Sequence, residues 1–528
     1  MNEPARKNSD YDSIVIGGGH NGLVCACYLA RAGHRVLVVE AADRVGGAAV
    51  TREFAPGFRV SAGAHLLHQM PARVIDELAL ESHGLRWAAL DLATVALAGS
   101  AAPVVMQSDG SIEGPGIGGD REAYALLWQR LRRFATALRP ALEMVPPELG
   151  PNSWPDRMNL LHLGWRLRRL GRRDMRELLR IGGMNVYDLL TDYLSAPLVQ
   201  GAVALDAVLG TNLGPRAPGT VMTLLYRLAA LNGTGTRGIA LPLGGLGAVS
   251  DALAAAARKA GVEIRLSTPV QQVLVNDDRA CGVRLQSGES INARHVVSNA
   301  DPKTTLLTLV GTEHLDAGFV RRTSHLRTNG LAAKFHLALD GLPTFSGLPA
   351  AAHGARLLIA PTPDYVERAY NHSKYGEYSQ APALEITLPS VNDPTLAPAG
   401  KHVLSAIVQY APHQVTGGWP QHRATFARTI IDTIEPYAPG LRSLITANEL
   451  LTPQDLEREF RITGGHWHHV DLALDQFFAV RPIPGATRYV TPLAGLYLCG
   501  AGCHPGGGVM GTAGRNAARQ VLAGGTRA

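Results

Sequence analysis

Cysteine is scarce in this sequence: its 528 residues include five cysteines, and no two of them form a C-x-x-C pair. We therefore expect neither a disulfide framework nor dithiol redox chemistry of the thioredoxin kind. The same cysteine usage predicts a reducing, cytoplasmic location. Zinc-finger spacing and basic strands interleaved with aromatic residues are also absent, so we expect no nucleic-acid partner.

Long apolar runs are absent as well. No stretch of about 18 continuous apolar residues occurs, so the sequence predicts no transmembrane helix. Residues 1–10 are polar and resemble neither a signal peptide nor a transit peptide. Hydrophobic residues make up 46% of the chain and charged residues 18%, which argues against disorder. A chain of this length suits two intertwined domains.

Residues 11–40 have the pattern of one βαβ unit. An apolar strand at 13–16 precedes a G-x-G-x-x-G formed by Gly17, Gly19 and Gly22. Gly17 permits a tight turn, Gly19 lets the backbone approach a pyrophosphate, and Gly22 lets helix and strand pack closely. The pattern therefore predicts that this unit binds a dinucleotide.

The ends of the predicted helix and second strand supply polar groups to the same site. A helix over about 21–31 places its free N–H groups, with His20 and Asn21, at the phosphates. The second strand, 36–39, ends in Glu40, whose carboxylate can accept hydrogen bonds from ribose hydroxyls.

A second fingerprint follows directly. Arg44, Gly46 and Gly47 form an R-x-G-G, which resembles the segment that lies along the FAD diphosphate and ribityl chain in the amine oxidase and carotenoid desaturase superfamily. Many relatives have a basic residue after the two glycines, whereas Ala48 follows here. The resemblance implies that the dinucleotide is FAD and that Ala41 and Ala48 also lie beside it.

The C-terminal part of the chain contains a third glycine-rich segment. A strand at 496–499 leads into Gly-Ala-Gly-Cys-His-Pro-Gly-Gly-Gly-Val-Met-Gly over 500–511, and a helix is expected over 512–522. The bare backbone and the helix N-terminus can stabilise negative charge on a reduced flavin. The candidate flavin contacts here are Gly500, Ala501, Gly508, Val509, Met510 and Gly511.

The middle of the chain contributes one more block. A helix at about 248–260 is followed by strands near 262–264 and 269–275, and by a meander of short strands at 282–285, 290–292 and 295–297. This order resembles the inner FAD-domain segment of the superfamily, in which the residue at Val270 touches the adenine. No second G-x-G-x-x-G occurs, so we expect no separate NAD(P) domain.

Taken together, these motifs resemble the phytoene desaturase and carotenoid oxidoreductase-like FAD flavoproteins. The whole length is similar to the branch typified by pyridine nucleotide-disulfide oxidoreductase domain-containing protein 2. The resemblance implies an α/β, glutathione-reductase-like Rossmann-type FAD-binding fold with an inserted α+β substrate domain. We assign residues 1–70, 238–310 and 482–528 to the FAD-binding domain, and 71–237 and 311–481 to the substrate domain.

The resemblance also implies the chemistry. It indicates hydride transfer to flavin N5 from a C–C bond of a small apolar, isoprenoid-like or lipid-like substrate, as in a desaturase or dehydrogenase. The family includes saturases and isomerases, so a redox-neutral isomerase and a saturase that uses reduced FAD are alternatives. A flavin-bearing interaction protein without catalysis is a further alternative. The sequence leaves the oligomeric state open.

No general base can be named from the sequence. His65, His466, His468 and His504 are weak candidates for the catalytic site. Three histidines within residues 466–469 cannot all face one ion, so we expect no metal. Cys503 has no activating neighbour that the sequence identifies, so a catalytic thiol is not favoured.

Residues 157–180 are rich in arginine interleaved with leucine. They could form a basic amphipathic helix that lies on an anionic membrane. Alternatively, they form the solvated face of a helix packed on the core.

Overall fold

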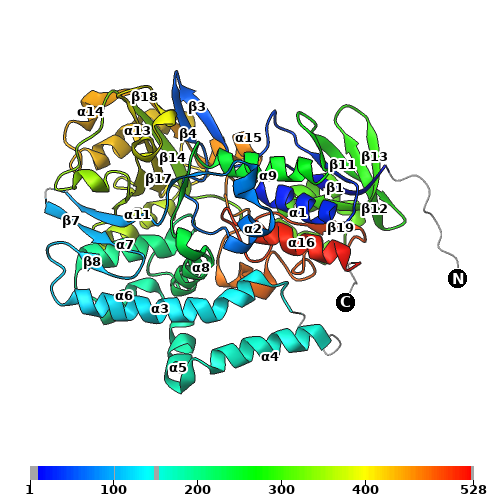
Figure 1. The fold of residues 1–528 in the computed structure, drawn as a ribbon, viewed down its shortest axis with the longest axis horizontal. Helices are drawn as coiled ribbons and strands as arrows, with labels where there is room; N and C mark the ends of the chain where they lie inside the picture. The colour runs from blue at the N-terminus through cyan, green and yellow to red at the C-terminus, as the bar shows by residue number, and fades with distance from the viewer. Residues whose placement is uncertain (1–9, 100, 148–153, 525–528) are drawn as a thin grey trace.

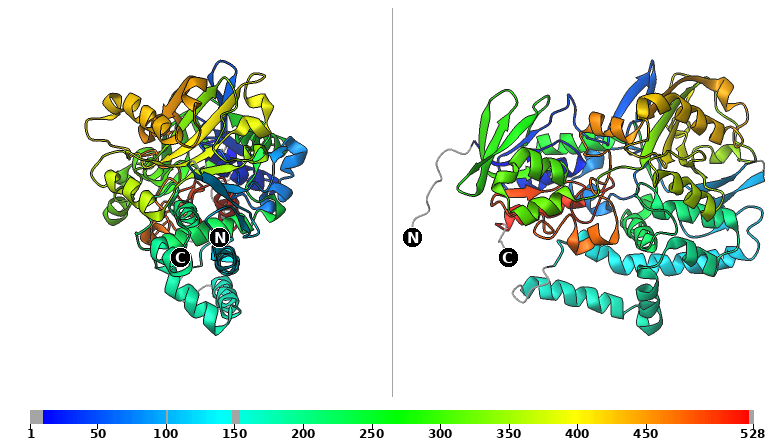
Figure 2. Two further views of the ribbon diagram at one scale, coloured as in Figure 1. Left: turned by 90° about the vertical axis from the view of Figure 1, so that its left-hand side faces the viewer. Right: turned by 180° about the vertical axis from the view of Figure 1, so that it is seen from behind.

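The computed structural model describes residues 10–99, 101–147 and 154–524. The described chain forms two lobes (Figures 1 and 2). One lobe contains a seven-stranded sheet built from both ends and the middle of the chain. The other contains an eight-stranded sheet and most of the helices. The predicted α/β fold class is confirmed.

The first sheet is parallel in its central part. Five strands pair in parallel, in the spatial order β10 (Glu263–Arg265), β2 (Val36–Val39), β1 (Tyr11–Ile16), β13 (Ser290–Ser298) and β19 (Leu496–Leu498). The first half of β13 pairs antiparallel with β12 (Arg279–Leu285), which pairs with β11 (Val270–Asn276). The two short strands predicted at 290–292 and 295–297 are thus one strand, because its two halves join two different parts of the sheet.

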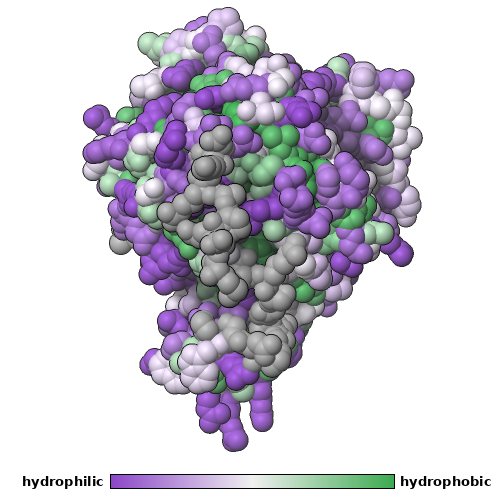
Figure 3. Space-filling view, turned by 90° about the vertical axis from the view of Figure 1, so that its right-hand side faces the viewer, coloured by the Kyte–Doolittle hydropathy of each residue, from purple (hydrophilic) through white to green (hydrophobic). Residues whose placement is uncertain are grey.

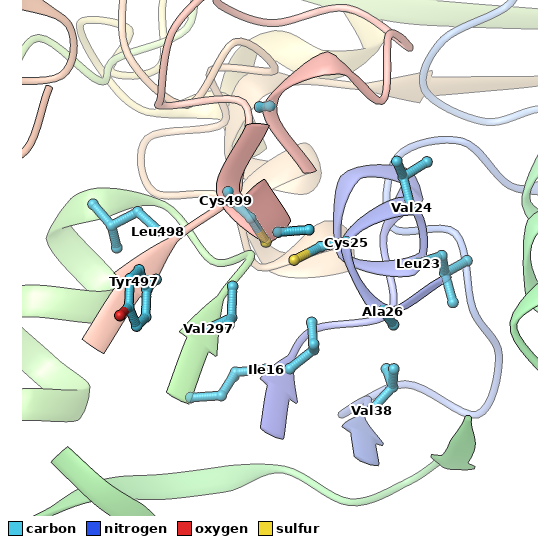
Figure 4. Packing of buried hydrophobic residues seen from close by; sticks show 14 of the residues in the cluster. Ile16, Leu23, Val24, Cys25, Ala26, Val38, Val297, Tyr497, Leu498 and Cys499 are labelled. Atoms are coloured by element: carbon cyan, nitrogen blue, oxygen red, sulfur yellow. The ribbon is translucent and has the colours of Figure 1, made fainter. Parts of the chain in front are cut away.

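Helix α1 (His20–Arg31) packs on this sheet and against both α9 (Gly247–Lys259) and α16 (Thr512–Leu522). Cys25 on its buried face lies beside Cys499, and Ile16 and Val297 belong to the same core (Figure 4). Gly514 lets α16 come this close, because a Cβ there would lie 2.0 Å from the Asn21 carbonyl oxygen. The two ends of the chain therefore form one core beside the glycine-rich turn.

The second sheet is antiparallel except for the pairing of β15 with β6. Its strands, in spatial order, are β18 (Ile445–Leu451), β14 (Ala332–Leu339), β17 (His402–Gln409), β16 (Ala383–Thr387), β15 (Arg356–Ile359), β6 (Thr94–Ala98), β7 (Ala101–Met106) and β8 (Ile112–Glu113). Alternate residues face opposite sides: Ala96 and Leu358 belong to the core under the helices, whereas Val95 and Leu357 face the other side.

Helices cover both faces of this sheet. The core on one side includes residues of α3 (Asp120–Glu143), α6 (Val186–Tyr193), α7 (Pro197–Val208), α8 (Thr220–Asn232) and α11 (Pro363–Ser373). Helix α13 (Trp419–Ile434) covers the other side, where Trp419 and Phe426 are buried.

The hairpin of β3 (Thr51–Ala55) and β4 (Phe58–Ser61) connects the two lobes. Phe58 and Val60 pack on Ala338 and Val403 of the second sheet. Residues 51–61, although expected within the FAD-binding segment 1–70, thus pack on the sheet of the other lobe. The chain therefore crosses to the second lobe, which contains the eight-stranded sheet, just before His65.

The arginine-rich stretch forms two helices where we expected one. Helices α4 (Trp154–Arg168) and α5 (Gly171–Gly182) meet at Gly171, whose φ of +83° lies in the left-handed region. They project from the body below α3 (Figure 1), and hydrophilic side chains project from the lower tip of the molecule (Figure 3). In the part of the chain that the structure describes, no helix is long and apolar enough to span a bilayer.

Candidate functional site

One cavity runs from the glycine-rich turn of the first lobe into the second lobe. It is lined by residues of both lobes, from Gly17 and Gly19 at one end to Leu209 and Ile407 at the other. Its walls come from the β1–α1 turn, from α7 and α8, from strands β16 and β17, and from residues 460–472. The dinucleotide cradle and the wall formed by the second lobe are therefore parts of one continuous cavity.

The β1–α1 turn has the close packing that a dinucleotide cradle needs. A Cβ at Gly22 would lie 2.3 Å from the Gly17 carbonyl oxygen, and one at Gly19 would lie 2.6 Å from Nδ2 of Asn299. Gly17 has a φ of +93°, which favours glycine. Side chains at these positions would close the turn and fill the space beside it.

Buried polar atoms without partners show that this cradle suits a polar ligand. Nε2 of His20 and Oδ1 of Asn21, both at the start of α1, have no hydrogen-bond partner among the described residues. Burial lowers the pKa of His20 to about 4, so the ring is neutral near pH 7. A bound diphosphate and its ribose can supply the missing partners. The residues present therefore fit FAD.

Glu40 is held in place at the end of β2. Its Oε2 accepts a hydrogen bond from the Gly18 N–H at 2.6 Å, and its Oε1 accepts one from the Ala42 N–H at 2.8 Å. Each carboxylate oxygen has a further lone pair, so the group can also accept from ribose hydroxyls.

The residues that we expected to contact FAD divide into two groups. Those that line the cavity are Gly17, Gly19, His20, Asn21, Glu40, Ala41, Gly46, Gly47, Ala48, Val270, Ala501, Gly508 and Val509. Those outside its lining are Gly22, Arg44, Gly500, Met510 and Gly511. Gly22 packs on Gly17, and Gly511 precedes the first turn of α16.

Two members of the second group face elsewhere for identifiable reasons. Arg44 is exposed and pairs with the adjacent Asp43 at 2.9 Å, so its head turns to solvent. Met510 packs in the helical core, with its Sδ 3.6 Å from the hydroxyl of Tyr226.

The four candidate histidines also separate. His65 and His468 line the cavity, whereas His466 and His504 do not. Nε2 of His504 lies 2.9 Å from the Ala141 carbonyl oxygen, and Nε2 of His466 lies 3.5 Å from Oδ1 of Asp471. Both rings are buried and lie outside the lining of the cavity. Cys503 is buried too, and its thiol pKa is raised to about 12, which disfavours a thiolate.

Arg481 joins the glycine-rich loop to the cavity wall. This fully buried guanidinium donates to the carbonyls of Ala501 and Cys503 on one side, and of His468 and Asp471 on the other. Desolvation lowers its pKa to about 10, so it keeps its charge near neutral pH. No sequence motif pointed to this residue, which fixes two separate segments around the flavin site.

A buried polar network begins at His65. Its Nε2 lies 2.9 Å from Oε1 of Glu385 on β16, and its Nδ1 lies 2.9 Å from Nζ of Lys334 on β14. Lys334 also donates to Oγ of Ser405 on β17 at 2.9 Å. Because the ammonium donates to Nδ1, the ring proton belongs on Nε2, where it donates to Glu385. Burial and the nearby Lys334 lower the pKa of His65 to about 4.

Two arginines and a second carboxylate extend this network. Arg356 binds the other oxygen of Glu385 and contacts Oδ1 of Asp206 at 2.5 Å. Nε of Arg227 lies 3.3 Å from Oδ1 of Asp206, and its Nη2 lies 3.7 Å from Oε2 of Glu385. The arginines hold the pKa of Glu385 well below its usual range, despite its burial. None of these residues was expected from the sequence, although a lysine or glutamate within an apolar strand is itself unusual.

Comparisons with known proteins agree with this geometry. The family model described as "Flavin containing amine oxidoreductase" matches residues 22–522. Pyridine nucleotide-disulfide oxidoreductase domain-containing protein 2 of Mus musculus is 37% identical, over 98% of this chain and 94% of that protein. One of the subunits of limonene dehydrogenase from Castellaniella defragrans is 26% identical, over 97% and 94% respectively. A lycopene-forming phytoene desaturase of Pseudescherichia vulneris is 25% identical, over 94% and 96%.

A solved oxidoreductase from Methanosarcina mazei has the same fold, with a TM-score of 0.59 over 97% of this chain and 99% of that one, at 19% identity. The resemblance inferred from the motifs is confirmed, and so is FAD as the cofactor. The chain belongs to the family of flavin containing amine oxidoreductases.

Proposed function

We propose that this flavin-dependent oxidoreductase removes two hydrogens from a C–C bond of a largely apolar molecule. The observation that supports this is the continuity of the cavity: the dinucleotide cradle opens directly into a part lined by apolar side chains. These include Ala207, Leu209, Ile407 and Leu472. FAD, when bound, supplies the hydride acceptor.

The chain's own residues bind, orient and exclude water. The apolar wall desolvates the carbon skeleton and holds it against the cofactor, which lowers the entropic cost of reaction. Arg481 fixes the loop that carries Ala501, and thereby the approach between cofactor and substrate. The relatives named for limonene dehydrogenation and phytoene desaturation make hydrocarbons the first substrates to test.

Anaerobic transfer experiments test this proposal. The FAD-loaded protein is photoreduced and mixed with oxygen, a quinone or an unsaturated candidate, and the oxidised protein is mixed with saturated isoprenoids and lipids. We expect the flavin to bleach with a candidate substrate and to recover with an acceptor. If the double bond moves without net bleaching, the reaction is an isomerisation. If hydrogenation occurs only with reduced flavin, it is a saturation. No electron transfer to any partner would favour an interaction protein.

We propose in addition that α4 and α5 dock on an anionic membrane surface. Large apolar side chains are unusually exposed there: Trp154 is 71% exposed, Leu161 64% and Leu179 75%. Exposed arginines, including Arg168 and Arg172, lie on the same two helices. A basic and apolar surface of this kind suits anionic lipids, and each basic group near the membrane contributes about 1 kcal/mol. An apolar substrate dissolved in the bilayer would then lie close to the enzyme.

Sedimentation with vesicles tests this docking. We expect binding to anionic but not to neutral vesicles, and release at high salt. Replacing Arg168, Arg169, Arg172 and Arg173 by Gln should weaken binding without loss of FAD, whereas Arg442→Gln, on an exposed part of the second lobe, should not. Equal binding to neutral and anionic vesicles, or none to either, would refute the electrostatic docking.

A further inference from the structure

The wall that the second lobe contributes to the cavity contains charged groups, and its positive and negative charges are unequal in number. Five buried or half-buried groups form it: Asp206, Arg227, Lys334, Arg356 and Glu385. Three of them, Asp206, Arg227 and Glu385, line the cavity directly. The two carboxylates and the two guanidiniums compensate one another. A protonated Lys334 therefore leaves the wall with one net positive charge.

Lys334 has no anionic partner of its own. It is fully buried on β14, and its hydrogen bonds reach Nδ1 of His65 and Oγ of Ser405, which are neutral groups. No ion pair links it to a carboxylate among the residues that the structure describes. A buried ammonium without a bonded carboxylate is costly, and the cost falls if the lysine loses its proton or if a ligand brings a negative charge near it.

Arg227 is the cation of this wall that a ligand can reach. Its side chain is 14% exposed, and that exposure faces the cavity. Its distances to Asp206 and Glu385, 3.3 and 3.7 Å, are long, and Arg356 binds both carboxylates more closely. Arg227 donates no hydrogen bond to another residue in the described ranges. A guanidinium has five N–H donors, so it needs acceptors from a ligand.

We propose that this wall binds the carboxylate of an otherwise apolar acid, with Arg227 in contact with it and Lys334 balancing its charge. The inference rests on the proposed function and specifies its substrate class. The apolar residues Leu209, Ile407 and Leu472 line the same cavity and suit the hydrocarbon part of such a molecule. A cationic amine would meet an excess of positive charge in the same place, so this site disfavours the amines to which the family's description refers.

Carboxylate binding must then be linked to proton uptake by Lys334. Desolvation lowers the pKa of its ammonium to about 7, and a nearby anion raises it again. The other titratable groups that face Lys334 are His65, His336 on the same strand, and Glu385 on β16. Both histidines have lowered pKa values and stay neutral, and Glu385 stays ionised. Between pH 7 and 9, Lys334 is thus the group that takes up the proton.

Calorimetry on the full, FAD-loaded chain tests this with three probes of equal length: dodecanoate, dodecan-1-ol and dodecylamine. We expect dodecanoate to bind at least about tenfold more tightly than the alcohol, since charge-assisted hydrogen bonds distinguish them, and the amine to bind most weakly. Above pH 7 the affinity for dodecanoate should fall, up to about tenfold for each pH unit. Its binding enthalpy at pH 8 should differ between phosphate and Tris buffers, which reveals proton uptake.

Two variants and one control locate the site. Arg227→Met should lose the preference for dodecanoate, and Lys334→Met should lose the pH dependence and the proton uptake. Arg216→Gln, which changes an ion-paired arginine at the surface, should bind like the wild type. FAD content and thermal melting are measured for each. If Arg227→Met does not fold, the pH dependence of dodecanoate binding and the proton uptake of Lys334→Met test the inference alone.

Three results would overturn the inference: equal affinity for the acid and the alcohol, unchanged dodecanoate binding in both variants, or loss of FAD by Arg227→Met with dodecanoate binding intact. The last would assign Arg227 to the flavin. These measurements use oxidised protein without turnover. Failure of the redox proposal would therefore show as tight dodecanoate binding with no flavin reduction by any substrate, which is a separate outcome.

Discussion

Lys334→Met should change the stability of the protein in a strongly pH-dependent manner. Burial lowers the pKa of Lys334 from its ordinary 10.5 to about 7. At 1.36 kcal/mol for each pH unit, this corresponds to roughly 5 kcal/mol of destabilisation at and below pH 7. Between pH 7 and 10.5 the unfolded chain binds the proton and the folded chain does not, so stability rises with pH across that window.

The methionine variant removes this dependence and loses two hydrogen bonds. Each of those bonds, to His65 and Ser405, contributes about 1 kcal/mol. We therefore expect Lys334→Met to be less stable than the wild type near pH 10 and more stable near pH 7. The difference between the two free energies of unfolding should change by several kcal/mol over the window.

Urea unfolding of the FAD-loaded proteins at pH 7, 8, 9 and 10 measures this difference. Lys259→Met, at an exposed position near the end of α9, is the matched control and should track the wild type at every pH. A difference between Lys334→Met and wild type that stays constant from pH 7 to 10 would refute the reasoning. It would mean that Lys334 keeps an ordinary pKa in the folded protein.

Three further predictions concern the cofactor. The purified protein should be yellow and release FAD on denaturation. Glu40→Ala should weaken FAD retention on gel filtration, whereas the control Asp43→Ala, at an exposed position nearby, should not. Gly22→Ala should lose FAD and stability, because its Cβ would lie 2.3 Å from a carbonyl oxygen. Gly164→Ala, with no atom within 4 Å of the added Cβ, should change neither. Flavin absorbance measures the FAD content and thermal melting the stability, and equal losses in the two variants would contradict the packing argument. NADH and NADPH should not bleach the flavin rapidly in stopped flow, since we found one dinucleotide motif, and stoichiometric bleaching by either would contradict this.

The dinucleotide unit was predictable because its determinants are local. The turn between β1 and α1 needs glycine at fixed spacings, and the strand before it and the helix after it are contiguous in the chain. Helices α9 and α16 were placed within about a residue for the same reason: each has glycines or a strand at its ends. The single helix expected over 157–180 was wrong, because composition alone did not reveal that Gly171 turns the chain there.

The charged wall could not be predicted, because its members are distant in sequence and meet only where the second sheet packs against α7 and α8. His65 and Lys334 are 269 residues apart, and His65 and Glu385 are 320 apart. Antiparallel pairing of β14 and β16 with β17 brings Lys334, Ser405 and Glu385 together, and the crossing of the β3–β4 hairpin carries His65 to them. Each charge alone would destabilise an apolar core. His65, Asp206, Arg227 and Glu385 line one cavity, and Lys334 and Arg356 are bonded to them from behind. That convergence of costly groups is typical of a binding site, and it makes the charge of the ligand the first property of the substrate to establish.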